Sequence, residues 1–336
     1  MRPPVFWFAP PDRPVLRARL LAPIAAIYAW ITAARVAKPG YKSKVPVICV
    51  GNLNLGGSGK TPTVIALLDR LGQIGITAHV VTRGYGGSLA GPVQVNERRH
   101  KASEVGDEPL LLSAFAPVWV ARNRAKGVRA AENSGADVIV LDDGYQNPSV
   151  VKDVSIVVVD AGVGFGNGRV LPAGPLREPV AAGLLRADCV LSIGNTDQQK
   201  RFTDTWGTAI PVPLARARLV PLQTGMDWPG LRVLAFAGIG RPGKFFATLQ
   251  ELGVHIVRAE ALDDHQPLTD ALMKRLEFEA AASGAQLVTT EKDAVRLPTA
   301  FRPKVLTVPV RLEIEDWSVI DTALFRAGIS VSAEPP

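Results

Sequence analysis

The 336-residue chain is 47% hydrophobic and 21% charged, with a formal net charge of +7. These proportions are typical of a globular chain with room for two domains and exclude a disordered one. The positive charge favours anionic partners such as phosphates or acidic lipid, whereas the chain has no basic–aromatic run, zinc finger or RNA-binding signature, so we expect no nucleic-acid partner.

Residues 1–44 differ in composition from everything that follows. An aromatic, proline-rich stretch precedes apolar spacing that predicts a helix over 16–37, whose uncharged section, 20–34, is shorter than the roughly 20 residues of a membrane span. No small-x-small cleavage site follows, which argues against a secretory signal. The helix either packs in the core or lies in a membrane interface, and we favour the interface, with aromatic residues at headgroup depth and basic residues on acidic lipid. The aromatic residues are Phe6, Trp7, Phe8, Tyr28 and Trp30, and the basic ones are Arg13, Arg17, Arg19, Arg35, Lys38, Lys42 and Lys44.

The stretch 45–71 carries a phosphate-binding motif. An apolar, β-branched run at 45–50 predicts a buried strand, and apolar residues at helical spacing over 64–71 predict a helix. The glycine-rich turn between them is typical of a P-loop, whose N–H groups face phosphate oxygens where a Cβ would obstruct. In such a loop Lys60 reaches the β- and γ-phosphates and the Thr61 hydroxyl binds Mg²⁺. The predicted nucleotide-binding residues here are Asn54, Leu55, Gly56, Gly57, Ser58, Gly59, Lys60 and Thr61.

Asn54 stands where the strict P-loop pattern has glycine. Asparagine tolerates left-handed backbone angles better than most residues, so we expect the loop to keep its shape. The alternative is a glycine-rich turn with an incidental lysine. The order of strand, glycines, Lys-Thr and helix favours nucleotide binding.

Two pairs of carboxylates follow the P-loop. Asp107 and Glu108 open a predicted helix, where they could simply cap it. Asp142 and Asp143 come directly after the predicted strand 137–141, where a P-loop fold places its second metal-orienting group. The alternative for this second pair is a surface Asp-Gly turn.

Alternating apolar strands and helices up to residue 202 predict an α/β fold: a P-loop core, 45–202, with a mostly parallel sheet and helices on both faces. The irregular segment 162–179 is typical of an active-site loop or lid. Periodicity fades over 203–230, which we interpret as a junction to a smaller C-terminal α/β domain at 231–336. Cys49 and Cys189 lie in strand-like runs, which favours packing roles in a reducing compartment.

Two motifs mark the C-terminal domain. Gly238–Gly243 matches the G-x-G-x-x-G dinucleotide fingerprint, but Arg241 and Pro242 crowd the turn and a lone match is weak. His265, next to Asp264, is a candidate acid–base group or part of a surface polar turn.

Seven segments together resemble the tetraacyldisaccharide 4'-kinases, the lipid A 4'-kinases of Gram-negative bacteria. They are GNLNLGGSGKTP, TRGYGG, VGDEP, LDDGYQN, GFGNGRVLPAGPLREP, AGIGRPGKFF and TTEKDAVRL, in the expected order over most of the chain. The family's loop also lacks the first glycine. The family commonly has Asp-His-His in the second domain, whereas here Gln266 follows Asp264-His265.

The resemblance implies transfer of the ATP γ-phosphate to the 4'-hydroxyl of a tetraacylated glucosamine disaccharide 1-phosphate, giving lipid IVA. It implies a peripheral or monotopic protein at the cytoplasmic face of the inner membrane, using ATP and Mg²⁺, with an acylated lipid substrate and no obligate protein partner. It also implies the site roles. Asp107 is the general base with His265 as its partner, Glu108 and Gln146 surround the metal, Asp142 and Asp143 support metal or phosphates, and Arg177 meets phosphate charge.

Two other functional classes have to be weighed. A P-loop switch acting on a protein would suit the nucleotide motif, although Glu291-Lys292-Asp293 lacks the Asn-Lys-x-Asp pattern that reads guanine. A dinucleotide-dependent oxidoreductase would suit the C-terminal glycine motif.

Overall fold

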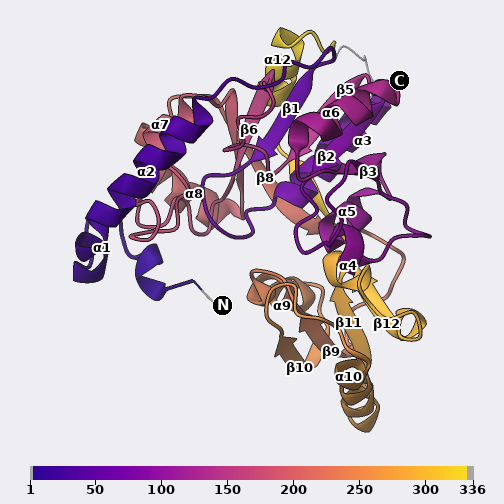
Figure 1. The fold of residues 1–336 in the computed structure, drawn as a ribbon. Coiled ribbons are helices and arrows are strands. Elements are labelled where there is room, and N and C mark those ends of the chain that lie inside the picture. Colours follow the sequence, from indigo (N-terminus) through magenta and orange to yellow (C-terminus); the bar gives the residue numbers. More distant parts are fainter. Residues whose placement is uncertain (1–2, 331–336) are drawn as a thin grey trace.

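The computed structural model describes residues 3–330, which form two lobes (Figure 1). The first lobe contains a nine-stranded sheet and the second a four-stranded sheet. The strands of the first sheet are β1 Val47–Gly51, β2 Ala78–Thr82, β3 Val93–Gln94, β4 Val118–Val120, β5 Val138–Asp142, β6 Val154–Asp160, β7 Cys189–Ile193, β8 Leu214–Pro221 and β13 Val310–Ile314. Those of the second are β9 Arg232–Ala237, β10 His255–Ala261, β11 Gln286–Thr290 and β12 Val305–Val308.

The first sheet has the order β13-β8-β7-β6-β1-β5-β2-β4-β3. Neighbouring strands from β8 to β4 run parallel, and only the edge pairs β13–β8 and β3–β4 are antiparallel. The carboxyl ends of β1, β5 and β6 therefore meet at one edge of the sheet, where ligands bind in open α/β sheets. The predicted α/β class with a parallel-dominated sheet is confirmed.

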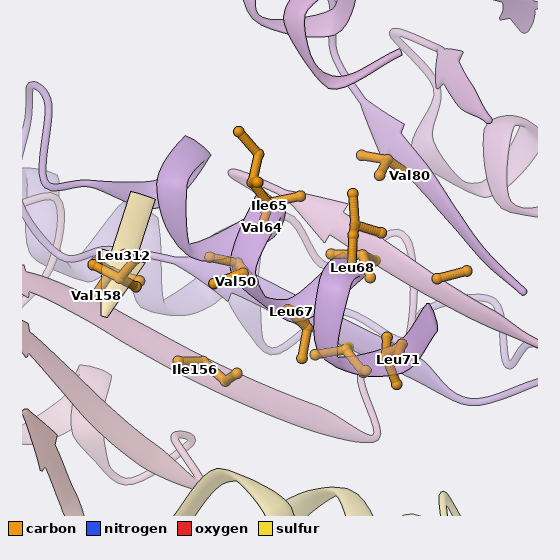
Figure 2. Close-up of a cluster of buried hydrophobic side chains, with 14 of the residues drawn as sticks. Val50, Val64, Ile65, Leu67, Leu68, Leu71, Val80, Ile156, Val158 and Leu312 are labelled. Atoms are coloured by element: carbon orange, nitrogen blue, oxygen red, sulfur yellow. The ribbon is translucent and has the colours of Figure 1, made fainter. Parts of the chain in front are cut away.

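Helices cover both faces of this sheet because successive strand residues point to opposite sides. In β1, Ile48 and Val50 pack into one apolar layer, and Val47 and Cys49 into the other. Figure 2 shows the first layer, in which side chains of α3 lie with Val50 of β1 and with Ile156 and Val158 of β6. The first layer contains residues of α3 Lys60–Gln73, α4 Ala102–Val105, α5 Asp107–Leu112 and α12 Ser318–Arg326. The second contains residues of α2 Ala22–Val36, α6 Arg124–Asn133, α7 Val180–Leu184 and α8 Thr196–Trp206, the last followed by η2 Gly207–Ala209.

The sheet boundaries differ from the predicted junction at 203–230 and the predicted domain at 231–336. Strand β8 lies inside the predicted junction, and β13 pairs with it after the chain has passed through the second lobe. Leu312 of β13 and Leu324 of α12 are buried in the same core as α3. The C-terminal segment from 310 on belongs to the first sheet because its apolar side chains complete that core.

The second lobe is a small parallel sheet with the order β10-β9-β11-β12. Helices α9 Pro242–Glu251 and α10 Asp270–Ala282 contribute to separate apolar layers on it, and short α11 Glu291–Ala294 and η3 Arg302–Lys304 follow. Two chain segments connect the lobes, 222–231 and the single residue Pro309 between β12 and β13.

The N-terminal segment forms η1 Val5–Phe8, α1 Leu16–Leu20 and α2. The helix predicted over 16–37 is therefore two helices, which meet at Leu21 just before Pro23 in the first turn of α2. Within residues 3–330, no helix has the length and apolarity needed to cross a bilayer.

Candidate active site

The loop between β1 and α3 has the shape of a phosphate cradle. Gly59 has φ +96°, and a Cβ there would lie 2.5 Å from Cδ1 of Ile193, so this position requires glycine. A Cβ at Gly56 or Gly57 would meet nothing within 4 Å, so their side of the loop is open. The Ser58 hydroxyl is buried and has no hydrogen-bond partner. An open loop at a helix N-terminus with an unpaired hydroxyl fits the phosphates of ATP.

Asn54 keeps its place in the loop by a different means from the one expected. It is not among the described non-glycine residues with positive φ, so the loop does not use the tolerance of asparagine for left-handed angles. Asn54 instead forms an antiparallel bridge with Leu176, and its Nδ2 donates to the carbonyl of Gly164 at 2.9 Å. Asn54 thus ties the P-loop to segment 162–179.

Lys60, Asp143 and Arg177 form a charged group beside the cradle. Asp143 Oδ1 lies 3.7 Å from Nζ of Lys60 and 3.0 Å from Nη1 of Arg177. Burial raises the pKa of Asp143, but the charges of Lys60 and Arg177 outweigh it and hold this pKa below its usual range. Asp143 also has φ 51°, a strained conformation that is typical of functional sites.

Asp142, the last residue of β5, is a buried carboxylate with an unsatisfied oxygen. It is 1% exposed, its Oδ2 accepts from the Thr82 hydroxyl at 3.2 Å, and its Oδ1 has no partner. Burial, together with the charges of Glu108 and Asp143, raises the pKa of Asp142 to about 7. An unsatisfied carboxylate among negative neighbours fits a cation, and in P-loop folds that cation is Mg²⁺ held with nucleotide phosphates.

The raised pKa makes Asp142 a source of pH-dependent stability without nucleotide. An unfolded Asp ionises near pH 3.9, whereas folded Asp142 keeps its proton to about pH 7. Asp142 therefore stabilises the fold fully below pH 4, and this contribution falls by up to about 1.4 kcal/mol per pH unit until pH 7. We expect Asp142→Asn to gain stability relative to the native protein as pH rises from 4 to 7. Urea unfolding across this range measures it, and parallel curves for the two proteins would contradict it.

The second lobe contributes His265 to the first lobe's Asp107. Nδ1 of His265 lies 2.9 Å from Oδ2 of Asp107, although 158 residues separate them in sequence. Asp107 is 4% exposed at the start of α5, and its Oδ1 accepts from the backbone N–H of Glu108 at 2.9 Å. The Tyr85 ring flanks His265, with ring centroids 5.5 Å apart. This contact brings together the carboxylate and imidazole that the sequence placed in separate domains.

Two cations from α11 and its flank surround the dyad. Lys292 lies 3.0 Å from Oε1 of Glu108 and 3.5 Å from Nε2 of His265, and Nε of Arg296 lies 3.8 Å from Oδ2 of Asp107. Burial raises the pKa of Asp107, but the hydrogen bond with His265 and the nearby cations lower it below its usual range. The same hydrogen bond raises the pKa of His265. The Asp107 carboxylate is therefore kept ionised, and the second lobe holds it through His265.

Comparison with known proteins identifies the family. The family model described as "Tetraacyldisaccharide-1-P 4'-kinase" matches residues 17–327. The chain is 62% identical over 326 residues to the tetraacyldisaccharide 4'-kinase of Dinoroseobacter shibae, covering 96% of this chain and 97% of that one. It is 58% identical over 325 residues to that of a Jannaschia species, covering 96% and 98%. The chain belongs to the tetraacyldisaccharide-1-P 4'-kinase family.

The fold of the kinase agrees with this assignment. It matches the crystal structure of LpxK from Aquifex aeolicus, described as a complex with ATP, with a TM-score of 0.73 and 26% identity over 93% of this chain and 99% of that one. The predicted activity is confirmed: the protein is an ATP-dependent phosphotransferase of lipid A synthesis, and this family's reaction uses ATP and Mg²⁺. Neither the protein switch nor the oxidoreductase is favoured.

The residues predicted to bind metal in the kinase differ in how far other side chains already occupy them. Within the described part of the chain, no three His, Cys, Asp or Glu side chains form a metal cluster. Gln146 donates to the Asn52 carbonyl and to Glu178, and its Oε1 accepts from Arg177 at 3.4 Å. Because these bonds occupy the side-chain amide of Gln146, they favour a role in holding Arg177 over the predicted contact of Gln146 with the metal. Asp142 Oδ1 has no hydrogen-bond partner, whereas both carboxylate oxygens of Asp143 accept from Arg177.

The family's second histidine is replaced without disturbing the first. Gln266 Oε1 accepts from the backbone N–H of Asp263 at 3.0 Å, and its carbonyl accepts from Arg296 at 2.8 Å. Gln266 thus closes the turn that presents His265 at φ 59°.

Sequence reasoning missed three residues at this site, Lys292, Arg296 and Arg124, and a fourth, Asp160, at the end of β6. Lys292 and Arg296 lie within TTEKDAVRL, which carried part of the family resemblance but was assigned no role. Buried Arg124 donates to the carbonyls of Asp142 and Asp143 at 3.3 and 3.2 Å. Asp160 ends β6 as Asp142 ends β5, and this shared signal could have identified it.

Proposed function

We propose that the kinase works from the cytoplasmic face of the inner membrane, with α1 and α2 lying in the lipid interface. The support is an apolar face on these helices without a protein partner in the described structure: Leu20 is 70% exposed, Ile27 59% and Trp30 72%. The opposite face of α2 packs on the sheet through Ala25 and Tyr28. An acylated substrate stays in the bilayer, so an interfacial helix brings the enzyme to it.

The charges around this face suit anionic lipid. The basic residues before and after the apolar section are all exposed and would meet acidic headgroups. They are Arg13, Arg17, Arg19, Arg35, Lys38, Lys42 and Lys44. Fewer of the predicted aromatic residues are available for lipid contact than expected. Trp7 Nε1 donates to the Pro172 carbonyl at 3.1 Å, and Tyr28 packs on the core. Trp30 is the aromatic residue best placed for lipid.

We assign the site residues as follows. Lys60 and the P-loop N–H groups bind the nucleotide phosphates, and Arg177 neutralises phosphate charge. Thr61, Asp142 and Asp143 would hold Mg²⁺ with those phosphates, and the ion would neutralise charge on the transferred group. Glu108 remains a candidate for the metal surroundings once Lys292 releases it.

Asp107 accepts the proton of the attacking 4'-hydroxyl, and His265 orients the carboxylate and stabilises its charge. The observation that carries this assignment is the 2.9 Å contact between the two residues. The dyad is complete only while the second lobe lies against the first. Incubation with γ-labelled ATP and the disaccharide in detergent tests the reaction, because label must appear in the lipid.

Membrane binding is tested by removing the apolar face. We expect Ile27→Ser/Trp30→Ser to weaken partition onto vesicles containing anionic phospholipid by at least about tenfold, since two large apolar side chains lose their burial. Co-flotation with the vesicles measures it. Phe278→Ser is the matched control, because Phe278 is 74% exposed on α10 of the second lobe. Equal flotation of the two variants would refute the interfacial helix.

A further inference from the structure

The lobes also touch at a place separate from the dyad. Asp160 at the end of β6 contacts Arg241 and Lys244, which lie at the start of α9 in the second lobe. In the sheet order β6 and β2 lie on opposite sides of β1. Asp107 follows Gly106, which packs against the segment after β2. The two contacts therefore flank the strand that leads into the P-loop.

The Asp160 contact is a buried ionic one. The Asp160 side chain is 6% exposed, and its Oδ2 lies 2.7 Å from Nη1 of Arg241 and 2.6 Å from Nζ of Lys244. Its Oδ1 accepts from the backbone N–H of Gly162 at 2.9 Å. Over the described residues, no cation of the first lobe lies within ion-pair distance of it.

Separation of the lobes would leave this carboxylate without a cation. A buried carboxylate held by one backbone N–H is costly, because burial disfavours charge that is not paired. Separation is therefore opposed at Asp160 independently of the dyad. Separation costs the two cations less free energy, since the side chains of Arg241 and Lys244 are already 31% and 40% exposed to water.

The same turn brings the second lobe onto the P-loop. A Cβ at Gly240 would lie 3.6 Å from the backbone N of Gly57. Only 222–231 and Pro309 connect the lobes covalently, so noncovalent contacts must set the angle between them. The dyad and the Glu291–Arg311 ion pair beside Pro309 restrain this angle, and the Asp160 contact across the P-loop restrains it further.

We propose that Asp160, Arg241 and Lys244 form an interlobe latch that holds the second lobe where His265 reaches Asp107. The latch residues are positioning residues, because they act on the reaction only through the lobe that carries His265. This role makes the G-x-G-x-x-G turn a docking element of the lobe: Gly240 approaches the P-loop, and Arg241 and Lys244 bind Asp160.

The distance between the lobes tests the latch directly. Cys49 and Cys189 are buried, so spin labels on Lys200→Cys in α8 and Lys274→Cys in α10 report the interlobe distance by pulsed electron resonance. We expect one narrow distribution in the native background without nucleotide. Arg241→Gln/Lys244→Gln should broaden it and lengthen its mean, and Asp160→Asn should do the same. Lys304→Gln, which removes an exposed ion pair within the second lobe, is the control and should leave it narrow.

Kinetics separate a latch from a nucleotide-binding role for the two cations. We expect Asp160→Asn and Lys244→Gln each to lower kcat by about 5–30-fold, the effect of one or two kcal/mol on a conformational equilibrium. Their combination should lower it no further, and Lys244→Arg should restore it. The latch is overturned if the double Gln variant keeps the narrow distance distribution. It is also overturned if Arg241→Gln weakens ATP binding while Asp160→Asn tightens it, because the cations would then be ligands of the nucleotide.

Discussion

Asp107→Ala is expected to lower kcat by about 10²–10⁴-fold, the contribution of a positioned general base. The nucleotide should still bind, because the contacts of Asp107 are with His265, Arg296 and the backbone of Glu108 rather than with the P-loop. Single-turnover phosphorylation of the disaccharide measures the rate, and titration with a non-hydrolysable ATP analogue measures binding.

Asp107 also joins the lobes, so loss of rate could have two origins. His265→Gln separates them, because it removes the interlobe partner and leaves the carboxylate in place. If Asp107 is the base, His265→Gln should cost clearly less than Asp107→Ala. Equal losses accompanied by equal lengthening of the interlobe distance would assign Asp107 a structural role. Near-normal turnover by Asp107→Ala would exclude it as the base.

The P-loop could be predicted from the sequence because its parts are contiguous. A strand, a glycine turn, Lys60 and a helix follow one another within 27 residues, so local patterns carry the whole inference. The carboxylates at the carboxyl end of β5 and at the start of α5 were recognisable for the same reason. Residue type indicates chemistry wherever backbone geometry at a strand or helix end is predictable.

The dyad could not be derived in that way. Asp107 and His265 meet only because the second lobe lies against the first, and no local pattern encodes a contact over 158 residues. Only the family resemblance joined them. Lys292 and Arg296 went without a role because a charged helix start has the same sequence whether it faces solvent or a buried carboxylate.

The domain boundary was misplaced for a related reason. Strand β13 lies at the edge of the first sheet, and only its third and fifth residues are buried, whereas the central strands are buried throughout. Such a short alternating run does not reveal which sheet it joins. The 88 residues from 222 to 309, which include the second lobe, separate β13 from its partner β8. The pairing of β13 with β8 therefore depends on the return of the chain to the first lobe and not on local preference.

Lys60→Met is expected to lower kcat by about 10²–10³-fold, the loss seen when one preorganised electrostatic group is removed. Lys60 is the first residue of α3, and its side chain is only 13% exposed beside Asp143. Its ammonium is therefore held next to the cradle, where negative charge collects during transfer. ATP affinity should fall as well, because the β- and γ-phosphates lose a point charge.

The fold should tolerate this change. Asp143 keeps Arg177 at 3.0 Å, so its half-buried carboxylate is not left without a cation, and methionine preserves the apolar stem of the lysine. We expect the free energy of unfolding to change by less than about 1 kcal/mol. Lys200→Met, at an exposed position of α8, is the control and should keep full activity. Full phosphorylation of the lipid by Lys60→Met would contradict this assignment. The nucleotide phosphates would then have to bind somewhere other than the turn between β1 and α3.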